Sequence, residues 1–295
     1  MALSNVGKAR TATPDPLVSL LSHFALQAGV FYTGNICGIH DFDRDTQRGH
    51  LHLIRRGVVR LDGTERVEYD ITEPTLVFLP RPEFHRLVAD NGAGADVVCG
   101  TVHFGGGRNP VTDSLPDVVM IELHQLQGVE MILDLMFQEA FADQRGRQAV
   151  LDRLCEVLVV MLLRHCVEHG VTRGGALAGL ADARIAPALQ AMHDAPASAW
   201  SLETLAQVAH MSRARFAARF KSVTGTTVAE YLTSWRLMAA QRLLASGNAP
   251  KAVAHEVGYA NASALARAFT RRWGVAPLTW LKTQRLSSDD ETIGA

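Results

Sequence analysis

Histidine and cysteine side chains recur in the first half of the chain at spacings that could assemble a ligand site. His50 and His52 are two residues apart, so on one strand they would share a face, and Cys99 and His103, four apart, would do the same. Neutral imidazole and thiolate together suit zinc, and three or four converging ligands would make a site. Buried cysteines also serve as small apolar residues, and buried histidines as hydrogen-bonded core groups.

A second chemistry is carried by arginines near the carboxyl end. The stretches RARFAARFK, residues 213–221, and SALARAFTRRW, residues 263–273, read as short helices with apolar residues on one face and arginines on the others. Phe216 and Phe220, four residues apart, would anchor the first helix in a core. A planar guanidinium meets O6 and N7 of guanine together, and an Asn amide pairs similarly with adenine. These helices are therefore candidates for insertion into a groove of DNA.

Polar residues on these two helices are the candidate DNA contacts. Most of them should bind phosphate, since phosphate contacts usually outnumber base contacts. We expect Arg213 or Arg215 in the first helix, and Asn261 or Arg267 in the second, to read bases. The full candidate set is Ser212, Arg213, Arg215, Arg219, Lys221, Asn261, Ser263, Arg267, Arg271 and Arg272.

The distribution of charge favours the same interpretation. The whole chain of 295 residues has a net charge of −1. Residues 200–285 contain twelve Lys and Arg against three acids, residues 286–295 contain three acids and no base, and residues 1–199 carry a net −7. A cationic segment on an acidic body suits phosphate binding, because Lys and Arg displace condensed counterions from the duplex. A solvated helical surface would explain the charge alone equally well.

Hydrophobic periodicity divides the chain into a β part and two helical parts. From about residue 28 to 124 the chain alternates with period two and predicts a compact barrel or sandwich, bounded at about 17–124, whereas residues 125–170 carry the i, i+3, i+4, i+7 pattern of two helices. The Gly-rich segment 172–184 is the candidate linker, and 185–285 reads as short helices. The predicted class is multi-domain α+β, with an acidic tail over 286–295.

The last hundred residues predict two helix-turn-helix units in tandem. In the first, Ser201 would cap a supporting helix and Ser212 the next one, after a turn at His210-Met211. In the second, Pro250 would begin the supporting helix, and Asn261 or Ser263 would cap the helix after the Gly258-Tyr259 turn. In such units the second helix lies in the major groove.

These residues also carry a family resemblance. The stretches "SLETLAQVAHMSRARFAARFK" and "AHEVGYANASALARAFTRRWGVAP" closely resemble the DNA-binding domain of the AraC/XylS transcription regulators. The resemblance covers residues 185–285 and implies two helix-turn-helix subdomains joined by a long helix near 228–245. It also implies recognition helices near 212–221 and 262–272. Leu265 departs from the family, which generally has Phe there.

The acidic half resembles, more weakly, the cupin-type sensory domain that precedes this DNA-binding domain. "GHLHLIRRGVVRL" and "PTLVFLPRPEFHRL" look like the two short cupin motifs, with His85 five residues after Pro80. Two departures are that His50 stands at the usual acidic ligand position and Pro82 at a Gly. The resulting candidates for zinc or another divalent metal are His50, His52, His85 and Cys99. The candidates for lining an organic-ligand pocket are Cys37, His40 and His103.

Other features bear on assembly and location. Residues 154–163 are apolar around most of a helix, which favours a homodimer over burial within one subunit. The chain shows no run of 18 apolar residues and no secretory signal, so no membrane partner is expected. Four scattered cysteines favour a reducing cytoplasm.

The leading functional hypothesis is a cytoplasmic DNA-binding transcription regulator. Its barrel would sense a small molecule or ion, residues 1–171 would also dimerise, and an activator would contact RNA polymerase. The resemblance assigns no catalytic residue. The main alternative is a metal-dependent cupin enzyme with a DNA-binding tail, which needs an open coordination sphere and a general acid or base. A purely architectural DNA binder would leave the barrel without a role.

Overall fold

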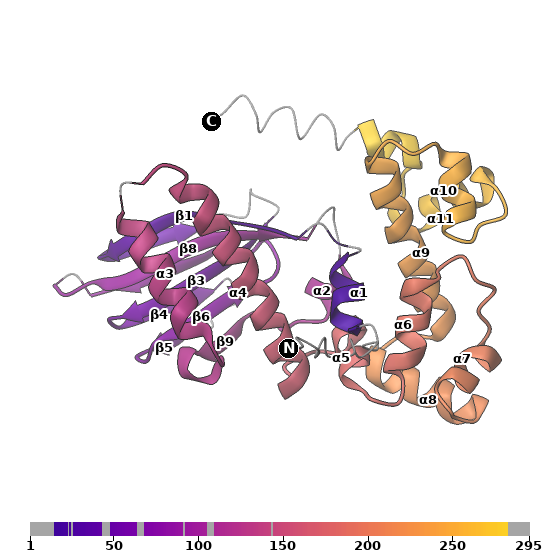
Figure 1. The fold of residues 1–295 in the computed structure, drawn as a ribbon, viewed down its shortest axis with the longest axis horizontal. Coiled ribbons are helices and arrows are strands. Elements are labelled where there is room, and N and C mark those ends of the chain that lie inside the picture. Colours follow the sequence, from indigo (N-terminus) through magenta and orange to yellow (C-terminus); the bar gives the residue numbers. More distant parts are fainter. Residues whose placement is uncertain are drawn as a thin grey trace, which may run out of the picture.

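The structure is a computed structural model, and it describes residues 15–282 except 23, 25, 43–47, 64–67, 91, 105–108 and 143. Figure 1 shows two parts beside each other, one built from strands and two long helices, the other from short helices around one longer helix. The predicted α+β organisation is therefore confirmed. The predicted acidic tail, 286–295, lies outside the described residues.

Within the described residues, nine strands form two antiparallel sheets. The first sheet, in spatial order, contains β1 (Gln27–Ile36), β8 (Ala95–His103), β3 (Gly49–Arg56), β6 (Thr75–Leu79) and β9 (Val119–Glu122). The second contains β2 (Gly38–Phe42), β7 (His85–Ala89), β4 (Val59–Gly63) and β5 (Glu68–Ile71). The sheets face each other across one apolar core, to which Ile54 and Val97 contribute from the first sheet and Leu61 and Leu87 from the second.

Strand β3 lies in the middle of the first sheet and is buried on both faces. Its first six residues, Gly49 to Ile54, are all buried, so burial does not alternate along it. Leu51 and Leu53 face the core under the helices, while Ile54 belongs to the core between the sheets. His50 and His52 alternate with the two leucines and therefore point between the sheets.

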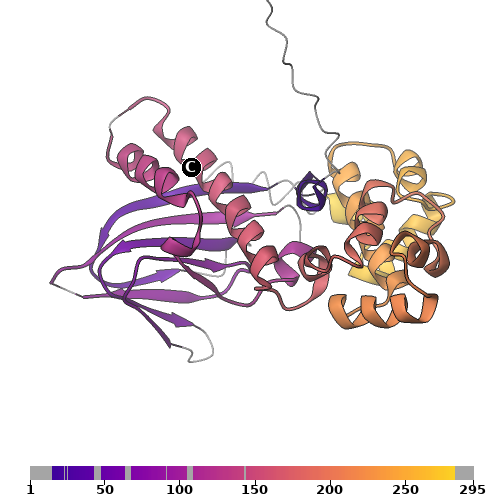
Figure 2. The ribbon, with the colours of Figure 1, turned by 60° about the horizontal axis from the view of Figure 1, so that its bottom comes forward.

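Two helices, α3 (Val129–Phe141) and α4 (Arg147–His169), cover the outer face of the first sheet (Figures 1 and 2). Helix α4 buries Leu151, Cys155, Leu158 and Leu162 there. It lies so close to the sheet that a Cβ on Gly100 would come within 3.2 Å of Cys155 Sγ. Much of the apolar surface predicted for residues 154–163 is thus buried within the subunit.

The carboxyl-terminal part is all helical, as predicted. Its helices are α6 (Ala186–Asp194), α7 (Leu202–Val208), α8 (Arg213–Thr224), α9 (Val228–Ala245), α10 (Pro250–Glu256) and α11 (Ala262–Trp273). The expected caps are present: Ser201 Oγ accepts from Thr204 N, Ser212 Oγ from Arg215 N, and Asn261 Oδ1 from Ala264 N. These caps fix where the helices α7, α8 and α11 begin.

The segment predicted as a linker, 172–184, contains a packed helix. Helix α5 (Gly175–Ala181) buries Ala176, Leu177 and Leu180. It contacts α2 (Pro110–Asp113), which lies between β8 and β9 in the chain, on one side and α6 and α8 on the other. The absence of a side chain at Gly179 allows close packing, because a Cβ there would lie 2.4 Å from Leu189 Cδ1.

One apolar core therefore runs from the outer face of the first sheet, through α5, into the first helix-turn-helix unit. Helix α1 (Pro16–Ser22) packs at the same junction, where Ser19 Oγ donates to Asp194 Oδ1 at 2.6 Å. Just after this helix, the ring of Phe24 lies edge-on to Trp235, with ring centroids 5.9 Å apart. The second unit has a core of its own around Phe269. Among the described helices, none combines the length and apolarity needed to span a membrane.

Candidate functional site

The four candidate metal ligands meet between the two sheets. His50 and His52 come from β3, His85 begins β7, and Cys99 pairs with His52 across to β8. All four side chains are at most 3% exposed. Phe42, on β2, stacks on His85 with ring centroids 5.0 Å apart. The sequence did not single out Phe42, because its role depends on the pairing of β2 with β7.

Hydrogen bonds join three of these residues into a directed chain. The Sγ atom of Cys99 lies 3.1 Å from His52 Nδ1, His52 Nε2 lies 2.7 Å from His85 Nε2, and His85 Nδ1 lies 3.0 Å from the carbonyl oxygen of Glu83. One assignment of protons satisfies all three contacts: the thiol donates to His52, His52 to His85, and His85 to Glu83. In this state every member of the chain is neutral.

Burial favours the same neutral state. Burial, then the neighbouring His85 and His50, hold the pKa of His52 well below its usual value. Burial lowers the pKa of His85 to about 4 despite its bond to Glu83, and raises the pKa of the Cys99 thiol to about 12. The Nδ1 atom of His50 is also buried, and it has no hydrogen-bond partner among the described residues. That atom is available to a ligand entering the cluster.

The cluster is arranged as a hydrogen-bonded network and not as a coordination shell. Both ring nitrogens of His52 are bonded, and its 2.7 Å separation from His85 is shorter than the roughly 3.3 Å expected between two nitrogens on one zinc ion. In the part of the chain that the structure describes, no group of three or more His, Cys, Asp or Glu is placed to hold a metal. Metal binding at these residues stays a prediction.

The three residues expected to line an organic-ligand pocket do not join this cluster. Cys37 is exposed beside the β7–β8 turn, and His40 Nε2 contacts the carbonyl of Cys37 at 3.1 Å. Phe42, at the end of β2, pairs with His85, whereas Gly38, at its start, pairs with Ala89. Cys37 directly precedes β2 and is five residues from Phe42, which is about 16 Å along an extended strand. His103 is half-buried and is the last residue of β8.

The candidate DNA contacts lie on two helices whose opposite faces are anchored in cores. Phe216 and Phe220 of α8 are fully buried, as are Leu265 and Phe269 of α11. The apolar Leu265 therefore fills the position that the family generally gives to Phe. Every candidate is exposed: Ser212, Arg213, Arg215, Arg219, Lys221, Asn261, Ser263, Arg267, Arg271 and Arg272.

Three of these candidates are already engaged within the chain. Ser212 and Asn261 use their side-chain oxygens as helix caps, and Arg219 donates Nε and Nη2 to Asp182 Oδ2. A bidentate pair with adenine needs the oxygen and the nitrogen of the amide together, so Asn261 would have to give up its cap to make one. Arg213, Arg215 and Arg267 make no such side-chain contact within the described part of the chain.

Comparison with known proteins matches both parts of the chain. The cupin family model matches residues 15–168, and the helix-turn-helix domain model matches residues 205–283. An AraC-like transcription regulator of Streptomyces lividans is 37% identical over 259 residues, covering 77% of this chain and 84% of its own. The RCS-specific transcriptional activator RclR of Escherichia coli K12 is 29% identical over 231 residues, covering 77% and 81%. The structure of ToxT from Vibrio cholerae aligns over 88% of this chain and 94% of its own, at 16% identity and a TM-score of 0.38.

Proposed function

The chain belongs to the family of AraC-like transcription regulators, and on that premise we propose how its two parts divide the work. Residues 185–285 bind double-stranded DNA through α8 and α11, residues 1–171 sense an effector and dimerise, and 172–184 connect them. The observation that carries this division is the pair of helices with buried apolar faces and exposed arginines. Phosphate binding by these arginines supplies affinity, and base contacts supply specificity.

The effector site is the cluster between the sheets. A small molecule or ion that bonds His50 Nδ1 would satisfy a buried nitrogen that has no partner among the described residues. It would also compete with the three hydrogen bonds that link Cys99 to His52, His52 to His85, and His85 to Glu83. Such a ligand changes DNA binding only to the extent that it binds one arrangement of the protein better than another.

Binding of an effector fits this cluster better than direct oxidation of Cys99. Direct oxidation would make this thiol a redox sensor. Oxidants react fastest with exposed thiolates of low pKa. Cys99 is 1% exposed, and burial raises the pKa of its thiol to about 12. We therefore infer that Cys99 acts as a hydrogen-bond donor until a ligand disturbs the cluster.

We propose a homodimer formed through the outer surface of α3 and α4. Met131, Leu135 and Phe141 of α3 are 79%, 44% and 69% exposed, and Val157 of α4 is 45% exposed. Apolar side chains gathered on one face favour burial by a partner. Sedimentation equilibrium should give twice the chain mass for the wild type, and Met131→Glu should shift the population toward the monomer. A wild-type monomer at micromolar concentration would contradict the dimer.

The proposed location is the cytoplasm, and the proposed role is that of an activator that contacts RNA polymerase. RclR is itself named as an activator. Both RclR and the Streptomyces relative are named as regulators of transcription, which gives no support to a catalytic role for the cluster. Transcription from a selected operator with purified polymerase would separate activation from repression.

DNA recognition is tested by selecting an operator from random duplexes with the full chain. Arg215→Ala and Arg267→Ala should each cost about 1–3 kcal/mol on that operator, and each should relax specificity at a different base pair. Arg56→Ala is the matched control, because Arg56 is exposed on β3, away from both helices. Retention of the wild-type sequence preference by Arg213→Ala, Arg215→Ala, Asn261→Ala and Arg267→Ala alike would refute this assignment of base readers.

A further inference from the structure

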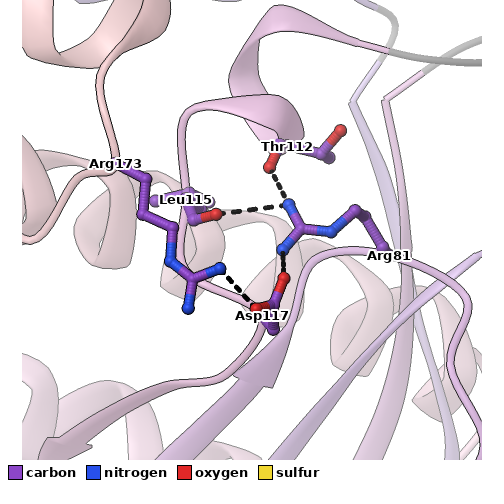
Figure 3. A network of polar contacts seen from close by, with 5 residues as sticks. All are labelled: Arg81, Thr112, Leu115, Asp117 and Arg173. Atoms are coloured by element: carbon purple, nitrogen blue, oxygen red, sulfur yellow. Dashed lines mark hydrogen bonds and ion pairs between the residues drawn. The ribbon is translucent and has the colours of Figure 1, made fainter.

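Asp117 is held between two arginines from different parts of the chain (Figure 3). Arg81 follows β6 and donates Nη2 to Asp117 Oδ1, while Arg173 follows α4 and donates Nη1 to Asp117 Oδ2. Arg81 Nη1 also donates to the carbonyl oxygens of Thr112 and Leu115. Burial alone would raise the pKa of Asp117, but the hydrogen bonds from Arg173 and Arg81 hold it below its usual value. The carboxylate is therefore charged at neutral pH and joins the two guanidinium groups.

The Arg81 side of this contact leads to the cluster between the sheets. Residues Arg81 to Phe84 form the loop that delivers His85, the first residue of β7. The carbonyl of Glu83, within this loop, accepts the hydrogen bond from His85 Nδ1. A ligand that reorients His85 would remove or redirect that bond. The loop that carries Arg81 would then lose one of the hydrogen bonds that hold it in place.

The Arg173 side leads to α5. Arg173 N donates to the carbonyl of Ser114 at 2.8 Å, and Ser114 Oγ accepts from Leu177 N at 3.3 Å. Gly175 has a φ of +72°, and a Cβ there would lie 2.3 Å from Ser114 Oγ. The amino end of α5 is thus seated directly on the α2 segment of the sensory part. It follows any movement of Arg173 and Ser114.

The carboxyl end of α5 is tied to the first recognition helix. Asp182 directly follows α5 and is 8% exposed in its side chain. Its Oδ2 accepts from Arg219 Nε at 2.8 Å and from Nη2 of the same side chain. Its Oδ1 accepts from Arg184 N at 3.0 Å and from Ile185 N at 3.3 Å. Burial would raise the pKa of Asp182, but these hydrogen bonds, led by that from Arg219, hold it below its usual value.

The junction also has room for α5 to shift. A cavity of about 140 Å³ lies beside it, lined by residues that include Pro110, Gly175, Thr224 and Arg272. A close-packed interior resists small displacements, whereas a void at an interface allows an element to take a second position. Helix α5, with an ion pair at each end and a cavity beside it, has the features of a movable connector.

We propose that α5 is a connecting rod between the effector cluster and α8, with Asp117 and Asp182 as the positioning residues at its two ends. The proposal rests on the proposed function of the cluster. In this structure Arg219 is not free to bind DNA, because its guanidinium group is paired with the carboxylate of Asp182. Movement of the Arg81 loop loosens Arg173, shifts α5 and releases Arg219 to a phosphate.

The experiment measures binding of the full chain to a 30-base-pair duplex of arbitrary sequence over a range of salt concentrations. Asp182→Asn keeps an oxygen for the hydrogen bonds from Arg184 N and Ile185 N but removes the charge that holds Arg219. It should bind roughly 3- to 8-fold more tightly at 0.1 M salt, with a salt slope steeper by about one. Asp117→Asn should give a gain of about twofold, and the double variant should not exceed Asp182→Asn alone.

Two controls isolate the contact. Asp134→Asn removes the same charge from another ion pair, with Arg55, away from the junction, and should leave binding unchanged. Adding Arg219→Gln to Asp182→Asn should abolish the gain. Unchanged or weaker binding by Asp182→Asn with an unchanged salt slope would overturn the proposal, and so would full additivity of the two Asp variants. A wild-type chain without salt-dependent duplex binding would instead refute the DNA-binding assignment itself.

Coupling must also operate in reverse, because linkage between two sites is reciprocal. Asp182→Asn, at the far end of α5, should speed amide hydrogen exchange in the peptide covering Arg81 to Arg86 by at least about twofold. Asp134→Asn should not change the exchange of this peptide. Wild-type exchange there in Asp182→Asn would show that α5 does not reach the cluster, whatever Arg219 does.

Discussion

The two helix-turn-helix units differ in what holds them. The first shares one continuous core with the sensory part, and its Arg219 is paired with Asp182. The second has a separate core around Leu237, Val253 and Phe269. An effector signal that travels through packed elements reaches the first unit directly. The second unit is connected through α9, so its contribution to DNA binding should depend less on the effector.

The largest expected effect tests whether these cores are separate. Phe216→Ala and Phe269→Ala each remove a fully buried ring, and each should cost about 3–5 kcal/mol of unfolding free energy. Hydrogen exchange should rise in α5 and α4 for Phe216→Ala but stay confined to α9–α11 for Phe269→Ala. Equal spread of exchange in both variants would show that the two cores act as one.

Acidification should affect the sensory part before the second unit. The pKa of His85 lies at about 4 in the folded chain against 6.5 for an unperturbed histidine, and the pKa values of His52 and His50 are also lowered. The unfolded chain binds these protons first, so stability is complete above pH 6.5 and falls as the pH drops toward 4. The loss from His85 alone is roughly 3 kcal/mol.

Urea unfolding at pH 7.5 and pH 4.5 measures this loss. His124→Gln is the matched control, because His124 is 73% exposed and lies outside the cluster. Exchange in α10 and α11 should change less with pH than exchange in β3 and β7. An unfolding free energy that is constant over this range would contradict the neutral hydrogen-bonded cluster.

Glycine substitutions compare the crowded junction with an open site in the second unit. Gly175→Ala places a Cβ 2.3 Å from Ser114 Oγ at a φ of +72°, whereas Gly247→Ala has a φ of +86° and no atom within 4 Å. Both variants incur the cost of a left-handed backbone, about 1 kcal/mol, and Gly175→Ala adds the steric term. Chemical denaturation should therefore show roughly 1–2 kcal/mol more loss for Gly175→Ala. Equal losses would show that α5 adjusts freely.

The smallest effect separates capping from base reading at Asn261. Asn261→Ser keeps an N-cap oxygen, so stability should change by less than about 0.5 kcal/mol. If the amide also reads adenine, the same variant should relax specificity at one base pair of the selected operator. Ser212→Ala, which removes the equivalent cap of α8, provides the comparison and should cost about 1 kcal/mol. Unchanged sequence preference in Asn261→Ser would assign this residue to capping alone.

Much of the helical part could be predicted because its signals are local. Ser201, Ser212 and Asn261 cap helices where the sequence placed them, and the spacing of Phe216 and Phe220 marks a buried face correctly. Residue types and the cupin resemblance make His50, His52, His85 and Cys99 candidate ligands, and the structure brings the four together between the sheets. Their bonding could not be predicted, because a 2.7 Å contact between His52 and His85 depends on how the two sheets face each other.

Two regions show what residue types leave open. Cys37 and His40 match the residue types of a ligand site, but the register of β2 against β7 places Cys37 five residues from Phe42, and His40 Nε2 contacts the carbonyl oxygen of Cys37. Segment 172–184 is Gly-rich, and two of its glycines allow close approach to Ser114 and Leu189. Composition reports what a residue can do, whereas register and packing decide which neighbour it meets.

The sequence alone determined the α+β division, the two helix-turn-helix units, the arginine-bearing faces of α8 and α11 and the family. Each of these depends on periodicity, capping or motif spacing over a few residues, which the chain order already contains. Only the tertiary structure decided that Arg219 is paired with Asp182 and that Asp117 joins Arg81 to Arg173. Those contacts link residues 36 to 56 positions apart, and a charge finds such a partner only when the packed core has placed both groups.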